Sequence, residues 1–507
     1  MSARAAFLCT LLSAATYGLA FPPYGWRIAA WLTLAPLLVA LRGAGVRRAV
    51  ALGTTWGVVG AYSVGTWLPT AVTRYYAQPA SVGAVAFLLC ASLTVVPYTV
   101  AFALLYRRSA GRFGALAPVV AGATWAASEM WRARSPAGNP WALVGYSQTA
   151  SLPLIQIADA TGVFGISFAV VTINAALSGL WWARSGARAA RTDALGGLAV
   201  AASTVVAILA YGMVRLHAAD DAGAAPVVVV QGNLDLGSQW RPELYGANLE
   251  AYANLTRSAL AQNPARLVVW PENALSFFLE GEPAYRRYIG QMLAPRRATL
   301  VTGGPRLVID PGHERDPRYL NAAFAVSEAG EIRDVYEKQY LVPFAEYFPL
   351  PALDILRRRF GRVRNFTPGT RHDPLSTPLG AAGILICNEA LYADVAIDRV
   401  DRGAQLLINL SNDGWVGDSR YAAIVFEMAR LRAVEVRRWL VRSSTSGPSA
   451  IVAPSGKVVA RAGFDEQRVI EGAVTPREGS TPYARAGDLF AWACTVLALA
   501  AAVGRRA

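Results

Sequence analysis

Gly383–Tyr392, which reads GILICNEALY, decides how we interpret the C-terminal half of this chain. Its first four residues are apolar and typical of a buried strand, which ends at Cys387. A polar turn containing Glu389 follows, and then a predicted helix. We expect this layout to place the thiol at a sheet edge facing a helix N-terminus, where backbone N–H groups favour a thiolate. Taken alone, Cys387 fits a core residue equally well.

The other cysteines and the histidines give no sign of a metal or disulfide site. Three cysteines lie in long apolar runs and are predicted to be small buried hydrophobes: Cys9, Cys90 and Cys494. The four cysteines have no paired spacing, and the three histidines match no ligand pattern. The sequence therefore predicts no disulfide framework, no metal and no cofactor.

The composition indicates a membrane protein rich in arginine. Of the 507 residues, 54% are hydrophobic and 16% are charged, which is too apolar for an ordinary soluble protein. The formal charge of +14 does not indicate nucleic-acid binding, because many arginines lie in short loops between apolar runs. Only two lysines occur, Lys338 and Lys457, so a retained lysine suggests a need for a compact ammonium group.

Eight apolar runs approach the roughly 20 residues that a helix needs to cross a bilayer. They predict a transmembrane domain of seven helices in residues 1–215 and an eighth helix in residues 487–507. The first run follows Arg4 like a signal peptide, but further runs come directly after it, so we predict a retained helix. The runs are residues 5–21, 28–41, 49–69, 81–106, 114–130, 161–183, 194–214 and 487–503.

Arginines in alternate loops predict the orientation. Basic loops at residues 42–48, 107–112 and 184–191 alternate with loops that are poorer in charge, and the chain ends in two arginines. By the positive-inside rule, both termini would be cytoplasmic. Residues 216–486 would then lie on the side of the membrane opposite the cytoplasm, which for a bacterial inner membrane is the periplasm.

Residues 216–486 read as alternating strands and helices, which predicts a layered α/β domain. A turn at residues 328–330 predicts one hairpin, and the turn Ser455–Gly456 predicts another. The predicted strands are residues 226–231, 266–270, 299–302, 321–326, 332–336, 383–386, 405–409, 450–454 and 457–460, and the predicted helices are residues 243–262 and 421–438.

An acid, a lysine and a thiol each follow one of these strands. Glu272 comes after strand 266–270, and Lys338 lies in the aromatic-rich run 336–349. Taken alone, Glu272 is predicted to be a surface carboxylate, whereas the apolar and aromatic neighbourhood of Lys338 argues against a solvated surface lysine. Lys457, in its turn, is predicted to be exposed. Together, Glu272 suits a general base, Lys338 an oxyanion stabiliser that also holds the base, and Cys387 a nucleophile.

Several short motifs then resemble the apolipoprotein N-acyltransferase family, the membrane-embedded branch of the nitrilase superfamily. The resemblance covers nearly the whole length. It is carried by NPW (139–141), GYSQ (145–148), VQGN (230–233) with Trp240, WPE (270–272), YEK (336–338), LVPFAEYFP (341–349), ICNE (386–389), SNDGWVG (411–417), MARLRA (428–433) and TPYAR (481–485).

The resemblance implies eight transmembrane helices carrying a periplasmic α-β-β-α sandwich, and it implies an acyl transfer. Cys387 would attack a phospholipid ester and form a thioester, and the α-amine of a diacylglyceryl-cysteine on an apolipoprotein would then take the acyl chain. Glu272 would move the protons, while Lys338 and the N–H after Cys387 would hold the oxyanion. The partners would be the phospholipid donor, the apolipoprotein acceptor and the bilayer, and nothing requires more than one chain.

The resemblance also implies roles for residues around this triad. Glu346 and Glu389 match supporting positions, and Trp240 and Trp415 match aromatic residues near the acyl and lipid substrates. Asn388 stands where the family commonly has tyrosine. Two further aromatic residues, Trp141 and Tyr146, are predicted to be interface anchors or to line a lipid access route.

Two other functions remain open from the sequence. A nitrilase-type amidase or esterase on a membrane anchor would use water as its acceptor, but a simple anchor needs one span rather than eight. A membrane scaffold without activity would have no need to keep Glu272, Lys338 and Cys387.

Overall fold

The chain divides into two compact units, each described here by itself. The helical unit comprises residues 1–73, 78–218 and 485–507, and the α/β unit comprises residues 74–77 and 219–484. The computed structural model describes residues 1–136, 138–184, 188–218, 222–234, 241–309, 311–312, 315–361 and 363–503, with the backbone alone at residues 351, 354, 357 and 358.

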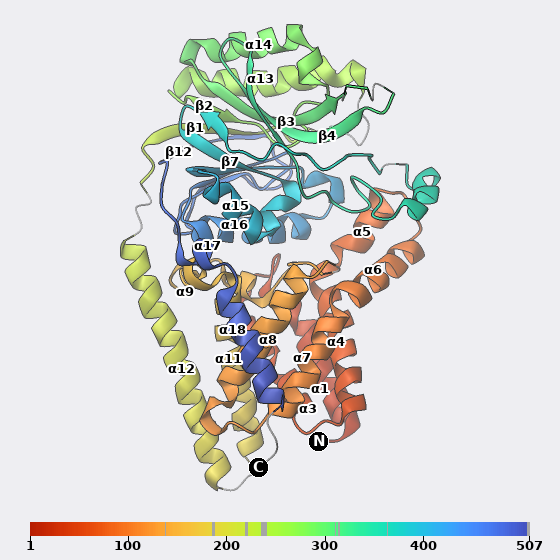
Figure 1. Cartoon of the computed structure of the whole chain (residues 1–507), viewed down its shortest axis with the longest axis vertical. Coiled ribbons are helices and arrows are strands. Elements are labelled where there is room, and N and C mark those ends of the chain that lie inside the picture. Colours follow the sequence, from red (N-terminus) through yellow and green to blue (C-terminus); the bar gives the residue numbers. More distant parts are fainter. Residues whose placement is uncertain are drawn as a thin grey trace. The chain divides into compact units, whose positions relative to one another are not determined.

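Each of the eight predicted apolar runs is largely helical (Figure 1). The α-helices are α1 (Ala3–Tyr17), α2 (Arg27–Thr33), α3 (Ala35–Leu41), α4 (Val46–Gly65), α5 (Trp67–Arg74), α6 (Ala80–Thr94), α7 (Val96–Ser109), α8 (Ala117–Arg134), α9 (Leu152–Ile155), α10 (Ala158–Thr161), α11 (Val163–Ala183), α12 (Arg188–His217) and α18 (Leu489–Val503). Short 3₁₀ helices lie between them at η1 (Gly18–Ala20), η2 (Gly114–Leu116) and η3 (Val144–Gln148).

The prediction of about eight spanning helices is supported only in part. Among the described residues, three helices are long and apolar enough to cross a membrane: Ala3–Ala20, Val163–Ala183 and Arg188–His217. A fourth is possible if α6 and α7, which meet at a bend of 42°, form one broken span. Proline explains two interruptions, since Pro36 and Pro97 stand in the first turns of α3 and α7 and cannot continue a preceding helix.

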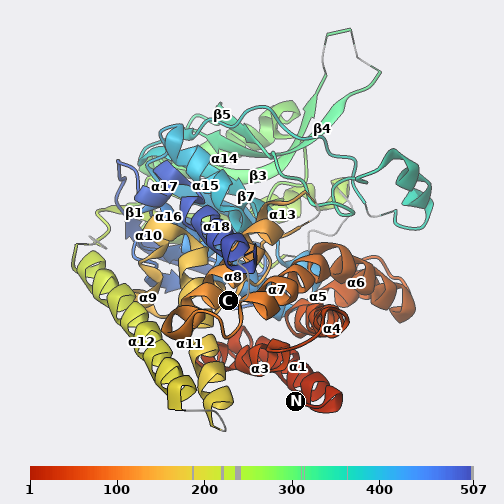
Figure 2. The ribbon, with the colours of Figure 1, turned by 60° about the horizontal axis from the view of Figure 1, so that its bottom comes forward.

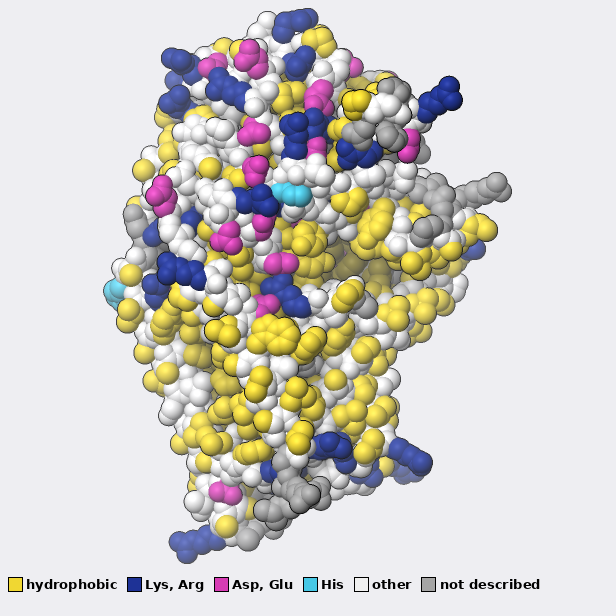
Figure 3. Space-filling view, in the orientation of Figure 1, with side chains coloured by type: hydrophobic (Ala, Val, Ile, Leu, Met, Phe, Trp, Pro, Cys, Tyr) yellow, Lys and Arg dark blue, Asp and Glu magenta, His cyan; other side chains and the backbone are white. Residues whose placement is uncertain are grey.

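Apolar side chains cover most of the visible surface over these helices (Figure 3). Leu8, Leu93, Leu195 and Val206 are all more than 60% exposed. So large an exposed apolar surface suits contact with lipid rather than water. Within the helical unit, α11 and α12 pack against each other (Figure 2).

The α/β unit contains two six-stranded mixed sheets (Figure 1). The first has the order β12-β1-β2-β3-β4-β5, and β1, β2 and β3 run parallel. The second has the order β11-β10-β9-β8-β7-β6, and β7, β8 and β9 run parallel. The strands are β1 (Ala225–Gln231), β2 (Leu267–Val269), β3 (Thr299–Val308), β4 (Arg318–Val326), β5 (Ile332–Glu337), β6 (Leu375–Thr377), β7 (Gly380–Ile386), β8 (Leu406–Ser411), β9 (Leu440–Ser444), β10 (Ala450–Val452), β11 (Val458–Arg461) and β12 (Arg468–Val474).

The two sheets pack face to face, and helices cover their outer faces. In β1, Val227 and Val229 join the core between the sheets, while Val228 and Val230 pack under the outer helices. A strand buried on both faces in this way reads as a continuous apolar run. The α-helices of this unit are α13 (Tyr245–Gln262), α14 (Pro283–Leu293), α15 (Ala393–Asp401), α16 (Ser419–Val436) and α17 (Pro482–Ala486), and its 3₁₀ helices are η4 (Pro242–Leu244), η5 (Leu279–Gly281), η6 (Ala294–Arg296), η7 (Pro351–Arg358), η8 (Cys387–Leu391) and η9 (Gly414–Val416).

This arrangement confirms the expected α-β-β-α sandwich. All nine predicted strands are present with shifted ends, and the predicted hairpins pair as β4–β5 and β10–β11. The sequence analysis missed β6, β9 and β12. The sequence pattern does not predict β9 because Arg442, Ser443 and Ser444 make it more than half polar, although all three side chains are buried.

Candidate active site

Three strand ends bring the predicted acid, lysine and thiol together. Glu272 follows β2 and Lys338 follows β5, and these two strands run in the same direction in the first sheet. Cys387 follows β7 of the second sheet directly. All three side chains are almost fully buried, with exposures of 4%, 1% and 5%. The site therefore lies where carboxyl ends of strands from both sheets meet.

Lys338 holds two carboxylates. Its Nζ lies 2.8 Å from Glu346 Oε2 and 3.8 Å from Glu272 Oε1. Burial alone would lower the pKa of Lys338, but the negative charges of Glu346 and Glu272 outweigh it and raise that pKa. The ammonium is therefore charged throughout the physiological range and stays available to stabilise further negative charge.

Asn321 links the same two carboxylates, and the sequence analysis missed it. From β4, its Nδ2 donates to Glu272 Oε1 at 2.7 Å and to Glu346 Oε1 at 3.0 Å. Its backbone also joins the site, because the Lys338 N–H donates to the Asn321 carbonyl at 2.9 Å. A buried amide inside the otherwise apolar run Asn321–Val326 was the signal that could have revealed it.

Glu272 has the character of a general base. Burial raises its pKa, while Lys338 opposes this shift, and the charge of Glu346 adds to it. One oxygen, Oε2, is buried without a conventional hydrogen-bond partner among the described residues. The Cys387 thiol is nonetheless close enough to lower the pKa of Glu272 as a hydrogen-bond donor. The carboxylate can thus take the thiol proton.

The expectation of a resting thiolate at a helix N-terminus is wrong. Cys387 begins the short 3₁₀ helix η8, and α15 starts only at Ala393. Burial and the neighbouring Glu272 charge raise the pKa of Cys387 well above its usual value, despite Lys338. The resting group is a thiol because a second buried negative charge beside Glu272 is unfavourable.

Cys387 also has an unusual backbone. Its φ is +53°, in the left-handed region that non-glycine residues rarely adopt. Such a conformation costs roughly 1 kcal/mol and tends to persist at functional sites. The other three cysteines lie in the helical unit, and Cys9 and Cys90 are only half-buried, contrary to expectation, whereas Cys494 is buried.

Three of the predicted supporting residues have contacts within the α/β unit. Glu346 contacts Lys338, and Glu389 accepts a hydrogen bond from the Ile386 N–H at 2.7 Å. Trp415 stacks edge-on with Tyr75 and lies near Tyr421, with ring centroids 5.3 and 6.3 Å apart.

The roles of all the predicted site residues stay predictions, and the other four lie as follows. Asn388 directly follows the nucleophile in η8. Trp141 and Tyr146 belong to the helical unit, where Trp141 Nε1 donates to the Val64 carbonyl and Tyr146 is buried. Trp240 lies outside the described residues.

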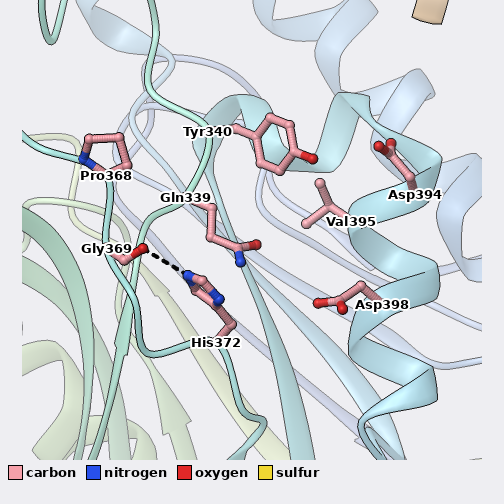
Figure 4. Close-up of a pocket in the computed structure, with 8 residues that line it drawn as sticks. All are labelled: Gln339, Tyr340, Pro368, Gly369, His372, Asp394, Val395 and Asp398. Carbon is pink, nitrogen blue, oxygen red and sulfur yellow. Dashed lines mark hydrogen bonds between the residues drawn. The ribbon is translucent and has the colours of Figure 1, made fainter.

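A separate pocket of about 390 Å³ opens beside this site (Figure 4). It lies between the loop at residues 368–372 and α15, and Gln339 and Tyr340 form the wall between them. None of the three predicted catalytic side chains lines it. No group of three or more His, Cys, Asp or Glu side chains in the described part of the chain is arranged to hold a metal ion.

Comparison with known proteins gives full-length relatives. A family model described as carbon-nitrogen hydrolase matches residues 228–483, and one described as apolipoprotein N-acyltransferase N-terminal domain matches residues 13–176. Proteins named apolipoprotein N-acyltransferase from Geobacter metallireducens and Azotobacter vinelandii are each 34% identical, covering 97% and 94% of this chain and 93% and 91% of their own. The solved structure of Saccharomyces cerevisiae Nit3, a member of branch 10 of the nitrilase superfamily, aligns with 50% of this chain and 90% of its own, at 22% identity and a TM-score of 0.36.

Proposed function

The chain belongs to the apolipoprotein N-acyltransferase family, and from this premise we propose that it transfers a fatty acyl chain from a phospholipid to an apolipoprotein. The acceptor is the α-amine of the diacylglyceryl-cysteine at the apolipoprotein's N-terminus. One observation carries the proposal at the level of residues. A thiol, a carboxylate and an ammonium group converge from three strand ends in a buried cluster.

In the first step, Cys387 Sγ attacks the ester carbonyl carbon of the phospholipid. Glu272 takes the thiol proton, and the carbonyl oxygen gains negative charge. The Lys338 ammonium and the backbone N–H of Asn388 stabilise this oxyanion. The ester C–O bond then breaks, Glu272 returns the proton to the departing oxygen, and a lysophospholipid leaves a thioester on Cys387.

In the second step, the apolipoprotein amine attacks the thioester carbon. Glu272 takes a proton from the amine, and the same groups stabilise the second oxyanion. The C–S bond breaks, the amide forms, and the proton passes to Cys387 so that the resting thiol is restored. The raised pKa of the thiol suits this closing step, because the site favours the protonated sulfur.

The membrane setting is part of the proposal. The three apolar helices and the family support a bacterial inner-membrane protein. We further propose about eight spans, cytoplasmic termini and a periplasmic α/β unit acting as a monomer. The alternating basic loops support this orientation. A hydrolase that used water would need only one membrane anchor, so this alternative does not explain the several apolar helices.

The proposal is tested by intact-mass spectrometry of the purified protein in detergent. Incubation with phospholipid alone should add one fatty acyl mass that neutral hydroxylamine removes and that a diacylglyceryl lipopeptide discharges. Cys387→Ala should gain no mass. A matched control replaces Cys9, Cys90 and Cys494 by alanine, and that variant should still be acylated.

Two results would contradict the proposal. Acylation that persists in Cys387→Ala would place the thioester elsewhere. An adduct that water discharges as fast as the lipopeptide does would favour the hydrolase.

A further inference from the structure

The Glu389 carboxylate is one of the most heavily hydrogen-bonded side chains in the site. Its Oε1 accepts from the backbone N–H groups of Gln339 at 2.7 Å and Tyr340 at 3.2 Å. Its Oε2 accepts from the Ile386 N–H at 2.7 Å. The Tyr336 hydroxyl lies 2.9 and 2.8 Å from the two oxygens. Glu389 is fully buried, so these partners replace water entirely.

These hydrogen bonds join the two segments that carry the chemistry. Gln339 directly follows Lys338 in the segment after β5 of the first sheet, and Ile386, the last residue of β7 in the second sheet, directly precedes Cys387. One ionised carboxylate therefore fixes the backbone beside the ammonium group to the backbone beside the thiol. A protonated carboxyl would lose part of this capacity, because its hydroxyl donates instead of accepting.

Arg399 of α15 decides which way the Tyr336 hydroxyl points. The Arg399 guanidinium is fully buried, and its Nη2 donates to Tyr336 Oη at 2.8 Å and to Gln339 Oε1 at 2.6 Å. Its Nε donates to the Ile384 carbonyl at 3.2 Å. Arginine has no acceptor, and a hydroxyl has one proton. The Tyr336 oxygen must accept from Arg399, so its proton is directed to Glu389.

We propose that Tyr336 and Arg399 are positioning residues for the acyl transfer. They keep Glu389 ionised and oriented, so that it holds the Lys338 segment and the Cys387 segment in register. Neither side chain needs to touch a substrate. The inference rests on the proposed function, because it assigns these residues to the same acyl-transfer site.

The hydrogen bonds that connect Arg399 through Tyr336 to Glu389 should affect the pH dependence of acyl-enzyme formation. Burial raises the pKa of Glu389, while the hydrogen bonds from Ile386 and Gln339 and the charges of Lys338 and Arg399 oppose that shift. Tyr336, Lys338 and Arg399 are therefore charged or titratable side chains that act on Glu389 from β5, its following loop and α15. Removing the Tyr336 proton donor or the Arg399 charge should make Glu389 protonate at higher pH.

The decisive experiment measures single-turnover formation of the acyl-enzyme against pH by intact mass. Tyr336→Phe keeps the ring, and its rate should fall by about tenfold to a hundredfold at low pH, the loss expected for one charge-assisted hydrogen bond. In this variant protonation of Glu389, rather than of Glu272, should limit the rate, so the acid limb should lie at higher pH than in the wild type, and the rate should approach that of the wild type in alkali. Arg399→Gln should shift the limb further, and Arg399→Lys should restore part of the shift by returning the charge.

Arg402 supplies a matched control one turn along. It shares the partner Asp398 with Arg399, but it is partly exposed, and among the described residues its hydrogen bonds go to Asp398 and Asp373 rather than to Tyr336. Arg402→Gln should therefore retain the wild-type rate and pH profile. If the Arg399 variants do not fold, Tyr336→Phe decides the question alone.

The outcomes separate this inference from the proposed function. A wild-type protein that forms no acyl-enzyme refutes the proposed function itself. A wild type that acylates normally beside a Tyr336→Phe variant with an equal rate, or with the same loss at every pH, refutes only the positioning role.

Discussion

Replacing Lys338 by arginine tests the oxyanion role most sharply. The substitution keeps the positive charge but replaces a compact ammonium by a planar guanidinium. Lys338 is 1% exposed, and its Nζ lies 2.8 Å from Glu346, so the larger group cannot occupy the same position without displacing its neighbours. We expect folding to survive and acyl-enzyme formation to collapse.

The expected sizes of the two effects differ. At an effective dielectric constant of about 20, the attractions of Lys338 to Glu346 and Glu272 are roughly 6 and 4 kcal/mol. Arginine retains much of this attraction, whereas Lys338→Met leaves both carboxylates without a cation and should cost about 3–5 kcal/mol of stability. Loss of an oxyanion donor lowers the rate by about 10²–10³-fold.

The assay compares single-turnover acylation and thermal melting in detergent for Lys338→Arg and Lys338→Met. The matched control is Lys457→Arg, which changes the chain's other lysine, an exposed side chain directly before β11. That control should acylate and melt like the wild type. If Lys338→Arg acylates within about threefold of the wild type, the role assigned to Lys338 is wrong, since that loss is far below the one expected for an oxyanion donor.

Three further predictions concern the same cluster. Because the pKa of Glu272 is raised, the acid limb of thioester formation should lie above the usual carboxyl range, where Glu272 loses its basic form as pH falls. Glu272→Gln should slow acylation by about 10²–10⁴-fold. A Glu272→Gln variant that keeps the wild-type rate would show that Glu272 is not the base. Asn321→Asp places a third carboxylate against Glu272, so acylation should fall by about tenfold or more, whereas an unchanged rate would show that the amide bridge is dispensable. Cys387→Gly should melt no lower than Cys387→Ala, because glycine tolerates a φ of +53° better by about 1 kcal/mol, and a clearly lower melting temperature for the glycine variant would argue against strain.

Local sequence signals predicted the strands because burial on both faces leaves a clear apolar pattern. Val227–Val230 of β1 and Gly383–Ile386 of β7 illustrate this, since their side chains alternate between two cores. The same reasoning did not foresee where the apolar helices are interrupted, because composition alone does not show where a helix bends. Pro36 and Pro97 mark two of these interruptions, because proline cannot continue a preceding helix.

The site was only partly predictable for a related reason. Lys338 was noticed because lysine is rare here, and Cys387 because it ends a strand. Asn321 gave a weaker signal, as the polar residue of an apolar run, and Arg399 gave none, since an arginine on a helix is common. The side chains that they contact in the site, Glu272 and Glu346 for Asn321 and Tyr336 and Gln339 for Arg399, are separated from them by 25 residues or more along the chain.

By itself, the sequence determined the α/β layering, the apolar character of the helical unit and the order of Glu272, Lys338 and Cys387. These follow from local periodicity and residue chemistry. Only the tertiary structure decided that Cys387 rests as a thiol and that Glu272 and Glu346 share Lys338 and Asn321. The reason is physical: desolvation and charge pairing depend on distances between groups that the fold alone brings within a few ångströms.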